Sequence, residues 1–488
     1  MAPEAVPPVP APSPRSAQRM VPLAAYEPKA YWQRVRALYA SSTAVILGNV
    51  LEWYDWTVFG YMQDIMKDVF GSGSGSQAWL LFAVPFLARP LGSVFFGWIG
   101  DVCGRATSLK IAIWGMALCT VLQGCLIPNT PGVAVLLAGL RIVTGLSAGG
   151  ESAGVNTYMS EVGDEGREHT LGAAIGVNNL SGSLAFLLAN VVLLLVHLLP
   201  REQQLAWAWR VPFLLALPLG VASIILRRHV PETEAFRRKV EMETARTQPV
   251  DSDEPGEGSS LSPQQKEEAQ VSPTKVKEPR SQWLWLSHLR LLLLVVMVLS
   301  AVNSCNYLPI YLVSWLEEEA QLSPSLALSI AAVAKVVQML MTFPVSFATD
   351  RYGATKVMLL GGGSVSLVAV PCLWLVMASS GGECWSGFLV LGLLLPVLIS
   401  IYLIPSNLFM TCVFPTPMRA RGCGLCLGLA SIAGGLTPMI ASQLAQQGEL
   451  WPGAFISLLS LPSLAVLLWS RREKAKSRLA VYQRPWLF

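Results

Sequence analysis

Residues 48–60 read Gly-Asn-Val-Leu-Glu-Trp-Tyr-Asp-Trp-Thr-Val-Phe-Gly, and they place two acids, Glu52 and Asp55, inside an apolar stretch long enough to cross a bilayer. A charge at the centre of a membrane helix costs roughly 2.5 to 3.5 kcal/mol, so such residues usually face a bundle interior or a water-filled cavity. Side chains three positions apart lie on one helical face. The stretch therefore predicts a membrane helix whose acidic face points into a bundle.

The composition of the whole chain predicts a polytopic membrane protein. Of its 488 residues, 53% are hydrophobic and 14% are charged, whereas soluble domains contain about 25% charged residues. The net charge of +4 is too small to indicate a nucleic-acid surface, and the nine cysteines have the spacing of neither a zinc site nor a disulfide framework. Because no nucleotide loop, metal cluster or nucleophile triad occurs either, we expect neither an enzyme nor a cofactor.

Hydropathy gives twelve candidate spans, six on each side of a polar segment. The segment, residues 232–282, is rich in Glu, Lys, Ser and Pro, which is typical of a disordered linker. The expected spans are residues 41–63, 78–100, 108–127, 133–159, 170–197 and 209–227, then 288–313, 325–349, 355–378, 386–412, 418–446 and 451–470. The expected division is a disordered tail over residues 1–35, a six-helix bundle over 36–231, the linker, a second six-helix bundle over 283–472, and a tail over 473–488.

Positive charge is concentrated in the short loops on one side of these spans, where Arg105, Lys110, Arg351 and Lys356 lie. The positive-inside rule places that side in the cytoplasm. We therefore expect cytoplasmic N- and C-termini and a cytoplasmic linker, in an integral multi-pass protein of the plasma membrane.

One loop motif occurs in both halves. Asp101-Val-Cys-Gly104-Arg105 follows the second span, and Asp350-Arg351-Tyr-Gly follows the eighth. Two bundles in repeat, with tight loops at matching places, are the plan of rocker-type secondary transporters. The acids and arginines can pair across the ends of the bundles, and glycine permits close approach of helices. We therefore predict gating residues in these loops: Asp101, Gly104, Arg105, Asp350 and Arg351.

Several stretches resemble known transporters. Residues 101–105 resemble the signature loop of the major facilitator superfamily, and Arg141-x3-Gly145-x3-Gly149 resembles its second motif. Five further stretches resemble its metabolite:proton symporter branch, to which the bacterial proline/betaine symporters belong: residues 48–55, 85–92, 145–151, 209–213 and 231–236. The resemblance covers nearly the whole chain outside the tails and linker. It implies an all-α membrane protein of twelve helices in two six-helix bundles, and proton-coupled symport by alternating access.

The departures from the branch concern the solute. The fifth span has Asn178 and Asn179 where the family often has an acid, and the eighth contains Lys335, a cation that the family does not lead us to expect. The loop after the eighth span has Ala354 in place of the usual arginine. The resemblance therefore leaves the identity of the solute open.

Three acids are candidates for proton coupling, namely Asp55, Glu52 and Glu151. A carboxyl group in a low-dielectric cavity can load and release protons, as a symporter requires. The alternative is a structural role, with Glu52 neutralised by Arg89, which counting from the span ends places at a similar depth. Glu151, in a run of small residues, is either a coupling acid or the partner of a cation.

Lys335 is a candidate counter-charge for a substrate carboxylate, together with Asn303, Asn306, Tyr307 and Arg89 as further substrate-binding residues. Asparagine and tyrosine orient small polar solutes by hydrogen bonds, although they also join helices. For Lys335 the alternatives are an internal ion pair with Asp55 or Glu151, or an extended side chain that reaches a polar end of the helix.

Aromatic residues flank the two acids of the first span. Trp53, Tyr54 and Trp56 can cage a quaternary ammonium group by cation–π contact. The alternative is that they pack against neighbouring helices.

These observations predict a proton-coupled symporter of a small polar metabolite, either an organic acid or a compatible solute such as proline or betaine. The alternatives are a receptor that binds solute without transporting it and an uncoupled uniporter. The expected partners are the solute, protons and the lipid bilayer, with no nucleic acid. The oligomeric state stays open.

Overall fold

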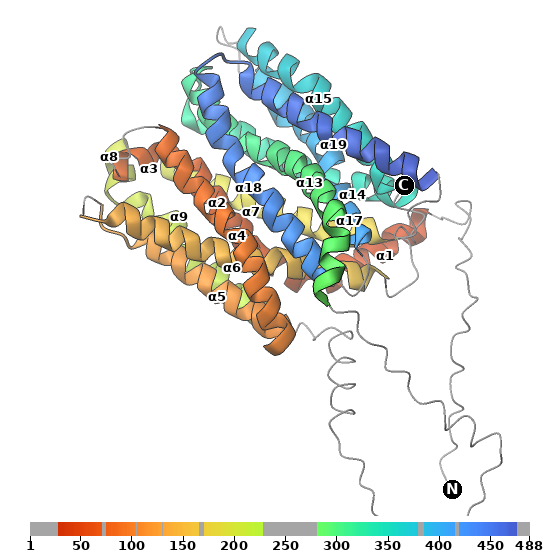
Figure 1. Cartoon of the computed structure of the whole chain (residues 1–488). Helices are drawn as coiled ribbons and strands as arrows, with labels where there is room; N and C mark the ends of the chain where they lie inside the picture. The colour runs from red at the N-terminus through yellow and green to blue at the C-terminus, as the bar shows by residue number, and fades with distance from the viewer. Residues whose placement is uncertain are drawn as a thin grey trace, which may run out of the picture.

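The computed structural model describes eight stretches of the chain, and all regular structure in them is helical (Figure 1). They are residues 28–70, 75–103, 105–128, 130–164, 170–227, 281–378, 385–414 and 419–475. Most of the expected tails and linker lies outside these stretches. The domain boundaries of the expected division therefore stay predictions.

The first half of the described chain supplies helices that correspond to the first six expected spans. They are preceded by α1, Pro28–Ser41. The helices are α2 (Thr43–Tyr61), α3 (Gln63–Phe70), α4 (Gly75–Cys103), α5 (Arg105–Gly124), α6 (Val133–Asp164), α7 (Leu171–His197), and the consecutive α8 (Arg201–Gln203), π-helical η2 (Gln204–Ala208), α9 (Arg210–Leu214) and α10 (Ala216–Arg227). The last four together form the sixth span.

The second half supplies the other six spans. Its helices are α13 (Ser281–Glu318), α14 (Pro324–Tyr352), α15 (Ala354–Ala378), the consecutive α16 (Trp385–Gly387), π-helical η3 (Phe388–Leu394) and α17 (Leu395–Val413), then α18 (Arg419–Ala445) and α19 (Trp451–Ala475). Ten helical segments of the described chain are long and apolar enough to cross a membrane. The two expected spans outside those ten are α2, which carries Glu52 and Asp55, and α5, which begins at Arg105 and contains Lys110.

Helix α1 occupies part of the sequence that we expected to be a disordered tail. Tyr31 and Val35, one turn apart, are buried against Ala173 of α7, and Tyr31 meets Phe347 of α14 edge-on with ring centroids 5.2 Å apart. Residues four apart lie on one helical face, so α1 is an amphipathic helix that joins the two halves. We call the end of the bundle that carries α1 the α1 end, and the end that carries α3 and α8 the α3 end (Figure 1).

The two halves pack along two helix pairs. Helix α18 lies against α4, and α14 lies against α7 (Figure 1). The largest apolar cluster contains Trp56 and Phe86 from the first half and Tyr307 and Tyr311 from the second. The core of the protein therefore continues across the interface between the halves.

The glycine motif in α6 explains how the first half is held together. A Cβ atom at Gly145 would lie 2.2 Å from the carbonyl oxygen of Pro85, and one at Gly149 would lie 2.2 Å from that of Arg89. Only glycine lets the α6 backbone approach α4 so closely. Arg141 lies one turn before Gly145, in the part of α6 that this contact fixes.

Candidate transport site

The two acids of α2 are each held by a buried arginine. Arg89 of α4 donates from Nη2 to Glu52 Oε1, and Arg141 of α6 donates from Nη1 to Asp55 Oδ2 at 3.0 Å. Thr120 of α5 also donates to Asp55 Oδ1 at 2.7 Å. The side chains of Glu52 and Asp55 are 0% exposed. The geometry thus agrees with the interpretation in which Arg89 neutralises Glu52, and it gives Asp55 a partner that the sequence analysis did not assign.

Each buried cation also covers an aromatic ring. The guanidinium carbon of Arg89 lies 4.2 Å from the ring centroid of Trp56, and that of Arg141 lies 4.1 Å from Phe59. Lys335 Nζ lies 3.9 Å from the ring centroid of Phe186. Such contacts stabilise a cation that has lost its water. The aromatic faces nearest to the acids are therefore occupied by the protein's own side chains.

A polar cavity lies between the halves. Its lining comes from α2, α7, α13, α14 and α17, and consists of Trp53, Asn178, Asn179, Gly182, Ser183, Phe186, Asn306, Lys335, Gln338, Leu403 and Asn407. It offers about 30 Å³ of space to water-sized molecules, which is room for roughly two waters. This space is smaller than a solute of metabolite size.

Lys335 is the cation of this cavity. Its side chain is buried, with the residue 2% exposed, and Nζ donates to Gln338 Oε1 at 2.9 Å. Among the described residues it forms no ion pair, and Asp55 is paired with Arg141 instead. The alternative in which Lys335 pairs with Asp55 is therefore wrong. Nor does the side chain reach a polar end of α14.

The expected substrate-binding residues of α13 separate into two groups. Asn306 lines the cavity. Tyr307 and Asn303 instead lie against Gly434 of α18, where an added Cβ would be 2.6 Å from Tyr307 Cδ2 and 3.0 Å from Asn303 Cβ. Tyr307 also meets the ring of Phe86 edge-on at 5.1 Å. Asn303 and Tyr307 thus belong to the helix interface, and Asn306 belongs to the cavity.

Other expected residues lie elsewhere. Arg89 is not part of the cavity lining, and Glu151 is buried in α6 outside it. Gln338 and Asn407 also line the cavity, and neither is among the residues expected from the sequence. Each is a polar side chain in an apolar span, and Gln338 lies one helical turn after Lys335, so this pattern could have identified them from the sequence.

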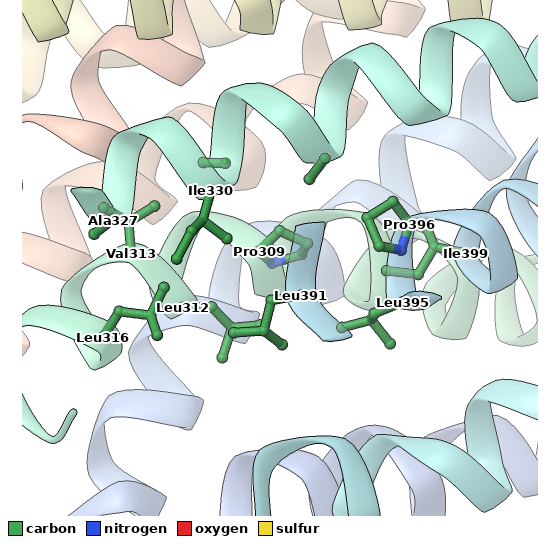
Figure 2. Close-up of a pocket in the computed structure, with 12 residues that line it drawn as sticks. Pro309, Leu312, Val313, Leu316, Ala327, Ile330, Leu391, Leu395, Pro396 and Ile399 are labelled. Atoms are coloured by element: carbon green, nitrogen blue, oxygen red, sulfur yellow. The ribbon is translucent and has the colours of Figure 1, made fainter. Parts of the chain in front are cut away.

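A second pocket lies within the second half, between α13, α14 and the η3–α17 segment. Figure 2 shows proline and aliphatic side chains around it, among them Pro309, Ile330 and Leu391. Its lining side chains carry no polar atom. This pocket therefore offers a polar solute no polar side chain among its lining residues.

Asp350 closes the α1 end. Its Oδ1 accepts a hydrogen bond from the backbone N–H of Gly172 at 2.6 Å, and its Oδ2 accepts from Ala173 N–H at 3.2 Å and from Tyr31 Oη at 3.1 Å. Gly172 and Ala173 form the first turn of α7, whose unpaired N–H groups favour a negative charge. A residue of the second half thus caps a helix of the first.

The remaining expected gating residues do not take part in this contact within the described structure. Arg351 is exposed, and its guanidinium carbon lies 5.6 Å from the ring of Tyr352. Asp350 therefore binds backbone N–H groups and a phenol, not an arginine as its loop motif suggested. Gly104 and the side chains of Asp101 and Arg105 lie outside the described residues.

Ion pairs close the α3 end. Lys67 of α3 lies 3.4 Å from Glu318 of α13, so this pair joins the two halves. Arg201 lies 2.9 Å from Asp64 and 2.5 Å from Asp68. All of these side chains are partly exposed to solvent. The Lys67–Glu318 pair thus joins the two halves at the α3 end, as Asp350 does at the α1 end.

Comparison with known proteins identifies the family. The sequence model of the family described as sugar (and other) transporter matches residues 41–486. The chain belongs to this transporter family. The family is one of membrane transporters and not of enzymes, and the resemblance to the major facilitator superfamily is confirmed.

Curated relatives are named as transporters of betaine and proline. The glycine betaine/proline/ectoine/pipecolic acid transporter OusA of Dickeya dadantii is 30% identical over 418 residues, which cover 83% of this chain and 77% of that protein. The proline/betaine transporter of Escherichia coli K12 is 29% identical over 435 residues, covering 86% and 81%.

Solved structures confirm the twelve-helix fold. The crystal structure of a D-xylose-proton symporter superposes with a TM-score of 0.63 at 15% identity, covering 88% of this chain and 97% of that one. The proton:xylose symporter XylE bound to 6-bromo-6-deoxy-D-glucose gives a TM-score of 0.64 at 16% identity, covering 89% and 95%.

Proposed function

We propose that this protein is a proton-coupled symporter that moves a small polar metabolite across the plasma membrane by alternating access. The observation that carries the proposal is the polar cavity between the halves, in a bundle that also holds two buried acid–arginine pairs. The curated relatives, which are named as transporters of betaine and proline, support the transport part of the proposal. The α1 end, with the termini, faces the cytoplasm in this proposal, as the distribution of positive charge favours.

Glu52 is the first candidate for the coupling acid. Its partner Arg89 covers Trp56, and Trp56 lies 6.3 Å from Tyr307 of the opposite half, measured between ring centroids. Protonation of Glu52 would release Arg89 at a surface where the halves meet. Asp55 is the second candidate. Its partners, Thr120 and Arg141, lie within the first half, so its protonation would act less directly on the surface where the halves meet. Glu151 is the third, buried in α6.

Alternating access requires that each end opens in turn. At the α1 end, the gate consists of the hydrogen bonds from Gly172, Ala173 and Tyr31 to Asp350. At the α3 end, it consists of the Lys67–Glu318 pair. Both gates join the two halves by a few polar contacts, which a rigid-body movement can break and remake.

The proposal is tested by solute uptake into proteoliposomes with an imposed pH gradient, using a pooled panel of labelled metabolites. We expect at least one solute to accumulate above its external concentration and to leave again when a protonophore is added. Glu52→Gln removes the carboxylate that Arg89 holds, so its yield and melting temperature are measured first; the folded variant should bind solute but not accumulate it, whereas Glu202→Gln, at an exposed acid of α8, should accumulate it normally. A uniporter would only equilibrate the solute, and a receptor would bind it without uptake.

A further inference from the structure

The three buried basic side chains of the site differ in what balances their charge. Arg89 holds Glu52 and Arg141 holds Asp55. Lys335 holds a neutral amide, that of Gln338, and covers a neutral ring, that of Phe186. Among the described residues that line its cavity there is no aspartate or glutamate. A buried charge needs an opposite charge or several hydrogen bonds, and the described chain provides one hydrogen bond.

Neutral polar groups beside Lys335 are available to a ligand. Asn306 and Asn407 line the cavity, and neither side-chain amide makes a hydrogen bond within the described part of the chain. Asn179, in contrast, donates to Thr342 Oγ1 at 2.6 Å and so links α7 to α14. An amide donates and accepts hydrogen bonds. The free amides therefore suit hydroxyl, keto or carboxyl oxygens of a solute.

The site lacks a place for a positively charged group. A quaternary ammonium binds to open aromatic faces or to carboxylates. The nearby face of Trp56 is covered by Arg89, and that of Phe186 by Lys335 itself. Trp53 is the remaining aromatic residue of the lining, and Gly182 packs against its ring. A Cβ atom built on Gly182 would lie 3.4 Å from Trp53 Cδ2. A cationic group in so small a cavity would lie close to Lys335 and be repelled.

We infer that the transported solute is a net-anionic carboxylate, such as a short hydroxy- or keto-acid, and that Lys335 and the amides of Asn306 and Asn407 bind it. This inference rests on the proposed transport function. It separates the chain from relatives whose names include betaine and proline, because those solutes carry a positive group as well as a carboxylate.

The inference is tested by binding to the purified protein in nanodiscs. The probes are pyruvate, lactate, malate and 2-oxoglutarate as anions, glycine betaine and proline as zwitterions, and choline as a cation. We expect at least one anion to raise the melting temperature of the wild type, and no zwitterion or cation to do so. Lys335→Met, which keeps the apolar stem, should weaken anion binding about a hundredfold or more, and Lys335→Arg should restore part of it. Lys356→Met, at an exposed lysine, is the matched control and should bind normally.

Several results would overturn the inference. They are the absence of binding by every anion, binding of betaine or proline by the wild type, and an anion affinity within about twofold of wild type in folded Lys335→Met. Uptake measurements on the same panel separate this inference from the transport proposal. Proton-driven accumulation of betaine would refute anion selectivity and leave symport intact, whereas anion binding without accumulation would refute symport and leave the site intact.

Discussion

Removing one charge of the Asp55–Arg141 pair should destabilise the protein severely. Both side chains are 0% exposed, and loss of one partner of a buried ion pair typically costs about 3 to 5 kcal/mol because the other charge stays buried. The stability lost in Asp55→Asn should lie near the lower end of this range, since an amide still accepts the hydrogen bond from Thr120. Arg141→Gln should lie near the upper limit, since it also loses the contact with Phe59.

A double-mutant cycle measures this effect. Asp55→Asn, Arg141→Gln and their combination are compared by the free energy of unfolding in mixed micelles. The double variant leaves no buried charge at this position, so its loss of stability should be smaller than the sum of the two single losses by about 3 kcal/mol or more. Single losses that add to within about 0.5 kcal/mol would show that the two residues do not interact, and would refute the pairing.

The same variants bear on function. A folded double variant that still concentrates solute under a pH gradient would remove Asp55 from the candidate coupling acids. A double variant that binds solute but no longer accumulates it would support Asp55 as the coupling acid.

Other predictions concern the gates and the packing. Asp350→Asn weakens the cap on α7, a charge effect of about 0.3 to 2 kcal/mol, so turnover should change severalfold while solute affinity stays close to wild type; a variant with lost affinity and a normal maximal rate would contradict a gating role. Lys67→Ala should shift the open–closed equilibrium of the α3 end by about fivefold at most, because an exposed pair contributes up to about 1 kcal/mol. The shift is measured as the yield of a crosslink between α3 and α13 at low and high salt. An unchanged yield would show that the pair with Glu318 is absent. Gly145→Ala should prevent stable folding, because its Cβ would meet the α4 backbone, whereas Gly139→Ala in the same helix, with nothing within 4 Å of its Cβ, should give a normal yield and melting temperature; equal yields would refute the close contact.

The helices of the fold follow from the sequence because a membrane span needs about twenty apolar residues whatever its neighbours are. The glycine motif of α6 likewise indicates a close helix contact by itself. The partner of Asp55 could not be predicted from the sequence, because Arg141 is distant along the chain and only the tertiary structure brings its helix beside α2.

The cavity was predicted in part, for a reason of helix geometry. Asn306 and Tyr307 are consecutive, so they lie about 100° apart around α13, and here Asn306 lines the cavity while Tyr307 packs against α18. Which of them faces the cavity depends on the rotation of α13 against α18, which the sequence pattern leaves open. Lys335 is a candidate from the sequence alone, because a lysine in an apolar span needs a reason. Helix α1 was not expected, because the residue that its Tyr31 meets, Phe347, is remote in sequence.

The most direct test of the account is transport of a carboxylate by purified protein in proteoliposomes whose interior is made more alkaline than the outside. The account predicts that an anion bound by the wild type accumulates above its external concentration, that protons enter with it, and that Glu52→Gln abolishes both movements. Equilibration of the solute without proton entry, or binding with no uptake at all, would contradict the central claim of proton-coupled symport.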